Sequence, residues 1–171
     1  MCMTPPKIVE GNLLYHAVHG LCWVNGVMTQ DQSGQKVPCY SLIPKVMNQM
    51  KTRFIIGVAD IEGSGFHVII SPKEANKLLR YLKIGNGTVV PKNQTWDLAQ
   101  TILSCAYDKS KVKDQRKRQI VERSVKGLVG ELAFVFNMTL KETAEKIQKQ
   151  LGAISRINPL VLAALAHAGE A

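Results

Sequence analysis

The sequence predicts an α+β protein, with a small antiparallel sheet and flanking helices followed by a helical C-terminal bundle. Up to about residue 90, short runs of β-branched and aromatic residues alternate with turn-forming residues, as in strands. From Thr95 onward, apolar residues recur every three or four positions, as in helices. The contents of 46% apolar and 20% charged residues are those of a globular chain. We therefore expect an α+β domain over 8–90 and a helical domain over 94–168.

The first elements are predicted from an apolar stripe and a turn signal. Over 12–22, apolar residues fall on one side of a helical projection, which predicts an amphipathic helix. Asn25-Gly26 lies between apolar pairs, and this dipeptide favours a tight hairpin turn because both of its residues accept positive φ. The two signals overlap, so the helix could be shorter than its stripe or the hairpin absent. Residues 30–36 are expected to form a polar loop.

Three strands and one helix are expected next. Residues 37–43, 53–59 and 66–70 are rich in strand-forming residues. The turn-forming run 60–65 predicts that the last two pair as an antiparallel hairpin. Ser71-Pro72-Lys73-Glu74 then predicts the start of a helix. Serine is a good N-cap residue, proline is favoured in the first helical turn, and the glutamate side chain can accept a hydrogen bond from the amide of the cap residue.

The C-terminal half is predicted to be helical throughout. We expect helices over 95–107 and 114–136, the second with apolar residues spaced by three and four. Thr139 and Glu142 form the sequence pattern of a capping box, which starts a helix ending near Leu151. Asn158-Pro159 should begin the last, short helix.

Positive charge is concentrated in one part of the chain. The formal net charge is +9, and residues 109–126 hold eight Lys or Arg against two acids. A cluster of this kind is typical of surfaces that bind polyanions, of which nucleic acid is the commonest. The alternative is a solvated basic loop and first helical turn. Lys and Arg near a helix N-terminus oppose the helix dipole, and a bound polyanion would relieve that cost.

A second pattern follows the basic cluster. Ala133 is small where two helices would cross, Asn137 can adopt the left-handed turn conformation, and Thr139 can cap the next helix. Together with the buried positions Met138, Ile147 and Leu151, these residues make 131–151 resemble the helix-turn-helix motif of bacterial and phage regulators. The resemblance implies that the exposed residues of the second helix face the major groove, namely Lys141, Glu142, Thr143, Lys146 and Lys149. Plain packing in a helical bundle is the alternative interpretation.

These two patterns predict a nucleic-acid-binding protein, and more specifically a DNA-binding regulator of bacterial, phage or plasmid origin. DNA is the expected partner rather than RNA, and a homodimer is allowed for. The expected binding residues are Lys109, Lys111, Lys113, Arg116, Lys117, Arg118, Arg123, Lys126, Thr139, Lys141, Thr143, Lys146 and Lys149.

Two other classes of function are weaker alternatives. A protein-interaction module would dock a partner through the seam helix and the apolar C-terminus, at Leu160, Val161, Leu162 and Leu165. A small hydrolase or nuclease would use Asp60, Glu62 and His67, brought together by the expected hairpin. Phosphate-binding and hydrolase motifs are absent from the sequence, so we do not expect an enzyme.

Metal ligands and cellular location are predicted from the histidines and cysteines. His16, His19, Cys22 and Cys39 lack the paired spacing of zinc sites, so neither a metal nor a cofactor is expected. The four cysteines show no regular spacing, which favours thiols in a reducing compartment. Without a hydrophobic leader or a membrane-length apolar run, we expect a cytoplasmic protein that does not enter a membrane.

Overall fold

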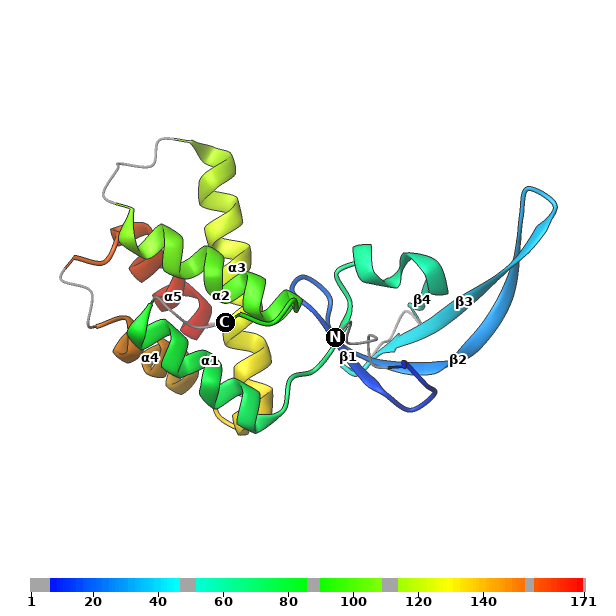
Figure 1. Ribbon diagram of the computed structural model, residues 1–171, viewed down its shortest axis with the longest axis horizontal. Coiled ribbons are helices and arrows are strands. Elements are labelled where there is room, and N and C mark those ends of the chain that lie inside the picture. Colours follow the sequence, from blue (N-terminus) through cyan, green and yellow to red (C-terminus); the bar gives the residue numbers. More distant parts are fainter. Residues whose placement is uncertain (1–6, 47–51, 86–89, 109–113, 153–155, 171) are drawn as a thin grey trace. The chain divides into compact units, whose positions relative to one another are not determined.

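The computed structural model describes residues 7–46, 52–85, 90–108, 114–152 and 156–170. Its contacts divide the chain into an N-terminal unit, Met1–Ile69, and a C-terminal unit, Ile70–Ala171. In the described residues, the first unit contains five strands and a short 3-10 helix, and the second contains five helices (Figure 1). The five-stranded antiparallel sheet and the C-terminal helices confirm the predicted α+β fold class.

The N-terminal unit is built on one antiparallel sheet with strand order β4-β3-β2-β1-β5. Its strands are β1 (Leu13–His16), β2 (Gly20–Gln32), β3 (Gln35–Pro44), β4 (Phe54–Gly57) and β5 (His67–Val68). β2 and β3 are the longest strands and form an extended ribbon (Figure 1). One face of the sheet carries the core, because Leu14 lies opposite Cys22 and Val24 opposite Leu42, all of them buried.

The helix expected over 12–22 is wrong, because these residues form β1, a turn and the start of β2. Leu14 pairs with Cys22, and His16 with Gly20, so the chain reverses within this segment. Gly20 has a φ of 71°, a conformation that glycine adopts without strain. Two short strands that run back on each other therefore produced the same apolar spacing as one helix.

The hairpin turn expected at Asn25-Gly26 is also wrong, because both residues lie inside β2. The register of β2 against β3 shifts between Val24 and Gly26, which marks an irregularity of the bulge type. The turn instead lies at Ser33-Gly34, where φ is 51° and 83°. The expected polar loop over 30–36 is therefore mostly strand.

The expected hairpin between the strands near 53–59 and 66–70 does not form. β4 pairs with β3 at one edge of the sheet, and β5 pairs with β1 at the other. The segment between them contains the 3-10 helix η1 (Val58–Gly63) in place of a hairpin turn. Phe54 is registered opposite Leu42, and Val68 opposite Leu14, so each strand has a separate apolar partner on the core face.

The C-terminal unit contains the helices that the sequence predicts. They are α1 (Pro72–Ile84), α2 (Gln94–Tyr107), α3 (Gln115–Phe136), α4 (Leu140–Leu151) and α5 (Pro159–Glu170). Side chains of Ser71, Asn93, Asp114 and Thr139 cap the first four helices. All five helices contribute to one core, whose fully buried members include Leu78, Leu82, Ile102, Leu128, Leu132, Ile147, Leu151 and Leu165.

α1 belongs to this helical core. Its apolar residues pack with those of α2, α3 and α4, and the division between the two units falls between Ile69 and Ile70. The sequence suggested a boundary after residue 90 instead. The apolar face of an amphipathic helix such as α1 can pack equally well on a sheet or in a helical bundle. The apolar spacing of α1 therefore does not predict which elements it packs against.

Candidate nucleic-acid interface

The first two turns of α3 are not packed against the other helices of the unit. Every side chain from Gln115 to Ile120 is exposed, and burial begins at Val121. In Figure 1 this end of α3 extends past the neighbouring helices of the C-terminal unit. A helix end of this kind is accessible to a large partner.

One side of the N-terminal half of α3 carries positive charge. Arg116, Gln119, Arg123 and Lys126 are all exposed and occupy positions i, i+3, i+7 and i+10, which share one helical face. We call these four residues the basic stripe. Buried Val121 lies on the opposite side of the helix. The stripe is about 15 Å long, a distance over which one DNA strand presents about four phosphates.

The remaining cations of the basic cluster lie off this stripe. The Lys117 ammonium is 3.1 Å from a carboxylate oxygen of Asp108, so it is partly neutralised. Arg118 is exposed on another side of α3. Lys109, Lys111 and Lys113 lie outside the described residues.

The helix N-terminus adds to the positive potential. Asp114 caps α3 by accepting a hydrogen bond of 2.9 Å from the Arg116 amide, but the first turn contains no acidic residue. The exposed N–H groups of the first turn carry partial positive charge. The basic residues that follow therefore oppose the dipole, and a bound polyanion would remove this unfavourable interaction.

The turn between α3 and α4 has the local geometry that the sequence predicted. Asn137 is left-handed, with φ 51° and ψ 48°, and the Met138 amide donates to the carbonyl of Ala133 at 2.9 Å. Thr139 and Glu142 complete a capping box through hydrogen bonds of 2.9 and 3.1 Å. The Thr139 amide that donates to Glu142 lowers the pKa of that carboxyl below its usual value.

The turn allows a stability prediction. Replacing Asn137 with alanine should destabilise the C-terminal unit by about 1 kcal/mol, because an L residue without a short polar side chain is strained in this conformation. Glycine at the same position should be neutral or slightly stabilising. Urea denaturation followed by helical circular dichroism measures both variants. Equal effects of alanine and glycine would contradict a left-handed Asn137.

The exposed face of α4 is electrostatically mixed. Lys141 and Lys149 are exposed, and the intervening residues Glu142 and Glu145 are exposed as well. The ammonium of half-buried Lys146 lies 4.8 Å from the centre of the Phe136 ring. The net positive charge on this face is smaller than that of the basic stripe.

The expected exposure of Thr143 is wrong. Its side chain is buried, and its hydroxyl donates a hydrogen bond of 2.8 Å to the carbonyl of Thr139. A hydroxyl one turn into a helix often bonds back to the preceding turn in this way, which removes it from the surface. Thr139 is exposed, but its hydroxyl is engaged in the capping box.

The residues named for the two alternative functions have different surroundings, and Leu160 and Leu162 are only partly buried. Val161 and Leu165 are buried in the core of the helical unit and are not available to a partner. Asp60 and Glu62 lie in η1, and His67 lies in β5, without the hairpin that was expected to place them together.

The candidate metal ligands are engaged in other contacts. The amides of Val18 and His19 donate to Nδ1 of His16 at 3.0 and 3.2 Å, while Nε2 lies 3.2 Å from the Ser64 carbonyl. His16 is therefore neutral, with its proton on Nε2. Cys22 belongs to the sheet core. Across the described ranges, no group of three or more His, Cys, Asp and Glu residues is arranged to hold a metal.

His16 makes the N-terminal unit sensitive to acid. Burial lowers the pKa of His16, and the nearby charge of His19 lowers it further. Because the folded pKa lies below the unfolded value of about 6.5, the unfolded chain takes up the proton first. The contribution of His16 to the free energy of unfolding of the N-terminal unit is therefore fully present above about pH 6.5. It is lost as the pH falls through the pKa of His16 in the folded state.

The test compares the free energy of unfolding at about pH 7.5 and about pH 5.5. The decrease in the free energy of unfolding on acidification should be smaller in His16→Asn, whose side chain can still accept hydrogen bonds from the amides of the turn. It should persist in His167→Asn, a change at an exposed residue of α5. An unaltered loss in His16→Asn would show that another group titrates.

Comparison with known proteins does not assign a class. No protein-family model matches the chain, and no curated protein matches it significantly. Among the described helices, none has the length and apolar content needed to cross a bilayer. The fold and the exposed end of α3 therefore define the protein as an α+β chain with a basic, helical C-terminal unit.

Proposed function

We propose that this protein binds nucleic acid through the basic stripe of α3. The observation that carries the proposal is the coincidence of charge and accessibility, because Arg116, Arg123 and Lys126 are all exposed and share one face of α3, whose first two turns are not packed against the other described helices of the unit. Counterions released from phosphates by these cations would supply the affinity.

Duplex DNA fits this surface better than duplex RNA. The major groove of B-DNA is about 12 Å wide and admits an α-helix, whereas the deep major groove of A-form RNA is too narrow for side chains to read. Gln119 lies between the cations of the stripe and can donate to or accept from a base edge. Lys141 and Lys149 of α4 would add phosphate contacts.

As a DNA-binding regulator, the protein would act in the cytoplasm, and a homodimer would present two basic stripes. Cys22, Cys39 and Cys105 are free thiols, which agrees with a reducing compartment.

Salt dependence tests the proposal. Fluorescence anisotropy with a labelled duplex DNA should give a micromolar complex at about 50 mM salt. If the three cations each neutralise one phosphate, affinity should fall about 40-fold on raising the salt to about 200 mM. A duplex RNA of the same sequence should bind more weakly. No salt-sensitive complex with either probe at micromolar protein would refute the proposal.

A further inference from the structure

A groove of about 530 Å³ lies between α1 and α4 in the C-terminal unit. Its volume falls in the range of about 300–1,000 Å³ that small-molecule sites occupy. α1 contributes Asn76, Leu79, Arg80, Lys83 and Ile84 to its lining. α4 contributes Lys146 and Gln150.

The groove concentrates positive charge. Arg80, Lys83 and Lys146 line it, and none of its described lining residues is acidic. Lys83 lies in the last turn of α1, where it also offsets the negative helix end. Arg80 and Lys146 lie before the last turns of their helices, so the helix dipole does not account for them. Three cations around one groove repel each other. An anion bound between them would be attracted to all three and so offset this electrostatic repulsion.

The cation from α4 is held in position before any ligand binds. Lys146 is half-buried, and its ammonium lies 4.8 Å from the Phe136 ring centre, a cation–π contact that restricts its side chain. Less conformational entropy is then lost when the ammonium meets an anion. The amides of Asn76 and Gln150 add neutral donors for further oxygens.

The groove also has an apolar surface. Leu79 is buried and lines the groove, while the Ile84 side chain is 62% exposed. A charged ligand without an apolar part would leave this surface in water. The lining therefore suits a molecule that joins a phosphate group to a flat, weakly polar ring system.

We propose that this groove binds a nucleotide, with its phosphates between Arg80, Lys83 and Lys146 and its base on Leu79 and Ile84. The nucleotide could be free in solution or be one unit of a single-stranded nucleic acid, because both present the same chemistry. The site does not use the basic stripe of α3, so it goes beyond the proposed duplex-DNA interface.

Isothermal titration of the full chain with ATP, tripolyphosphate and adenosine tests the site. ATP should bind more tightly than tripolyphosphate, and adenosine should show no binding, because both parts of the ligand contribute. In Arg80→Gln/Lys83→Gln the Kd for ATP should rise by at least about tenfold, the loss expected when charge-assisted hydrogen bonds are removed.

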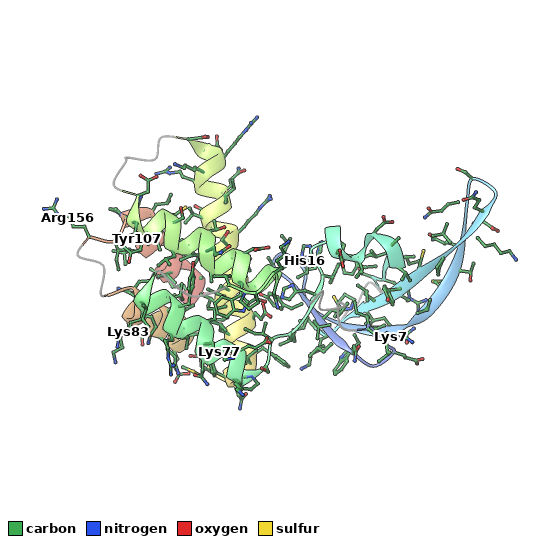
Figure 2. All side chains as sticks on the ribbon, viewed as in Figure 1. Lys7, His16, Lys77, Lys83, Tyr107 and Arg156 are labelled. Atoms are coloured by element: carbon green, nitrogen blue, oxygen red, sulfur yellow. The ribbon has the colours of Figure 1, made fainter. Side chains whose placement is uncertain are left out.

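Lys73→Gln/Lys77→Gln is the matched control. Both lysines are exposed on the same helix and do not line the groove, and Lys77 and Lys83 project from different positions on α1 (Figure 2). The control should keep its affinity for ATP within about twofold.

Competition identifies the source of the nucleotide. A single-stranded oligonucleotide that displaces ATP from the wild-type chain would assign the groove to nucleic acid, and one that fails to displace it would assign a free nucleotide. The inference would be overturned by no ATP binding at about 5 mM, by equal losses in the two double variants, or by tripolyphosphate binding as tightly as ATP. Neutralising the basic stripe should leave ATP binding intact, so the two proposals can fail separately.

Discussion

Replacing Glu131 with alanine should lower the free energy of unfolding of the C-terminal unit by about 3 kcal/mol or more. Glu131 is completely buried in α3. Its carboxylate accepts hydrogen bonds of 2.9 and 3.0 Å from the Thr95 hydroxyl and one of 3.3 Å from the Ile70 amide. Alanine would remove the acceptor of two buried donors and leave a cavity, and each unsatisfied donor costs about 1–3 kcal/mol.

Two variants separate the hydrogen bonds from the charge. Glu131→Gln keeps one acceptor oxygen and nearly the same volume, so it should recover a large part of the loss. Glu122→Ala removes an exposed carboxylate from the same helix and should change stability by less than about 0.5 kcal/mol. Urea denaturation followed by helical circular dichroism measures all three. Losses of the same size in Glu131→Ala and Glu122→Ala would contradict the buried network.

The helical unit was predictable because helix signals are local. Ser71 and Thr139 are followed within three residues by the glutamate of a cap, and both helices begin where the sequence places them. The spacing of Val121, Val125 and Leu128 predicts the buried side of α3 without knowledge of its neighbours.

The sheet was less predictable because strand pairing depends on residues far apart in the chain. Asn25-Gly26 and Ser33-Gly34 are both plausible turn sequences, and only the second joins two strands. Which of the two forms the turn depends on the pairing of Leu42 with Val24, and these residues are too far apart in the chain for a local sequence pattern to link them. The same holds for β4 and β5, which are adjacent in sequence but lie at opposite edges of the sheet.

The candidate sites also depended on packing that the sequence does not show. Nothing in the local sequence marks Glu131 as buried, yet it accepts hydrogen bonds from Thr95 and Ile70 inside the unit. Thr143 reads as a groove contact, yet it is buried. The α1–α4 groove was missed because Arg80 and Lys146 come from distant helices and no short pattern links them.

Removing the charge of the basic stripe should have the largest effect on nucleic-acid binding. Arg116→Gln, Arg123→Gln and Lys126→Gln together remove three cations from exposed positions, so the fold should be unaffected. Each lost phosphate contact reduces the slope of log K against log salt by about 0.9, and the triple variant should lose about 2.7. Affinity for duplex DNA should then fall about 500-fold at about 0.1 M salt but only about sixfold at about 0.5 M salt.

The matched control must change net charge equally without touching α3. Lys73→Gln, Lys77→Gln and Lys92→Gln remove three exposed cations from other parts of the C-terminal unit. If binding depended only on the long-range field of a basic chain, both triples would lose the same affinity and the same salt slope. If the stripe contacts the phosphates, the control should keep nearly the whole slope, because a cation that meets no phosphate releases no counterion from it. Anisotropy titrations at several salt concentrations distinguish these outcomes, since a non-specific field lowers affinity in both triples whereas a contact surface changes the slope in only one.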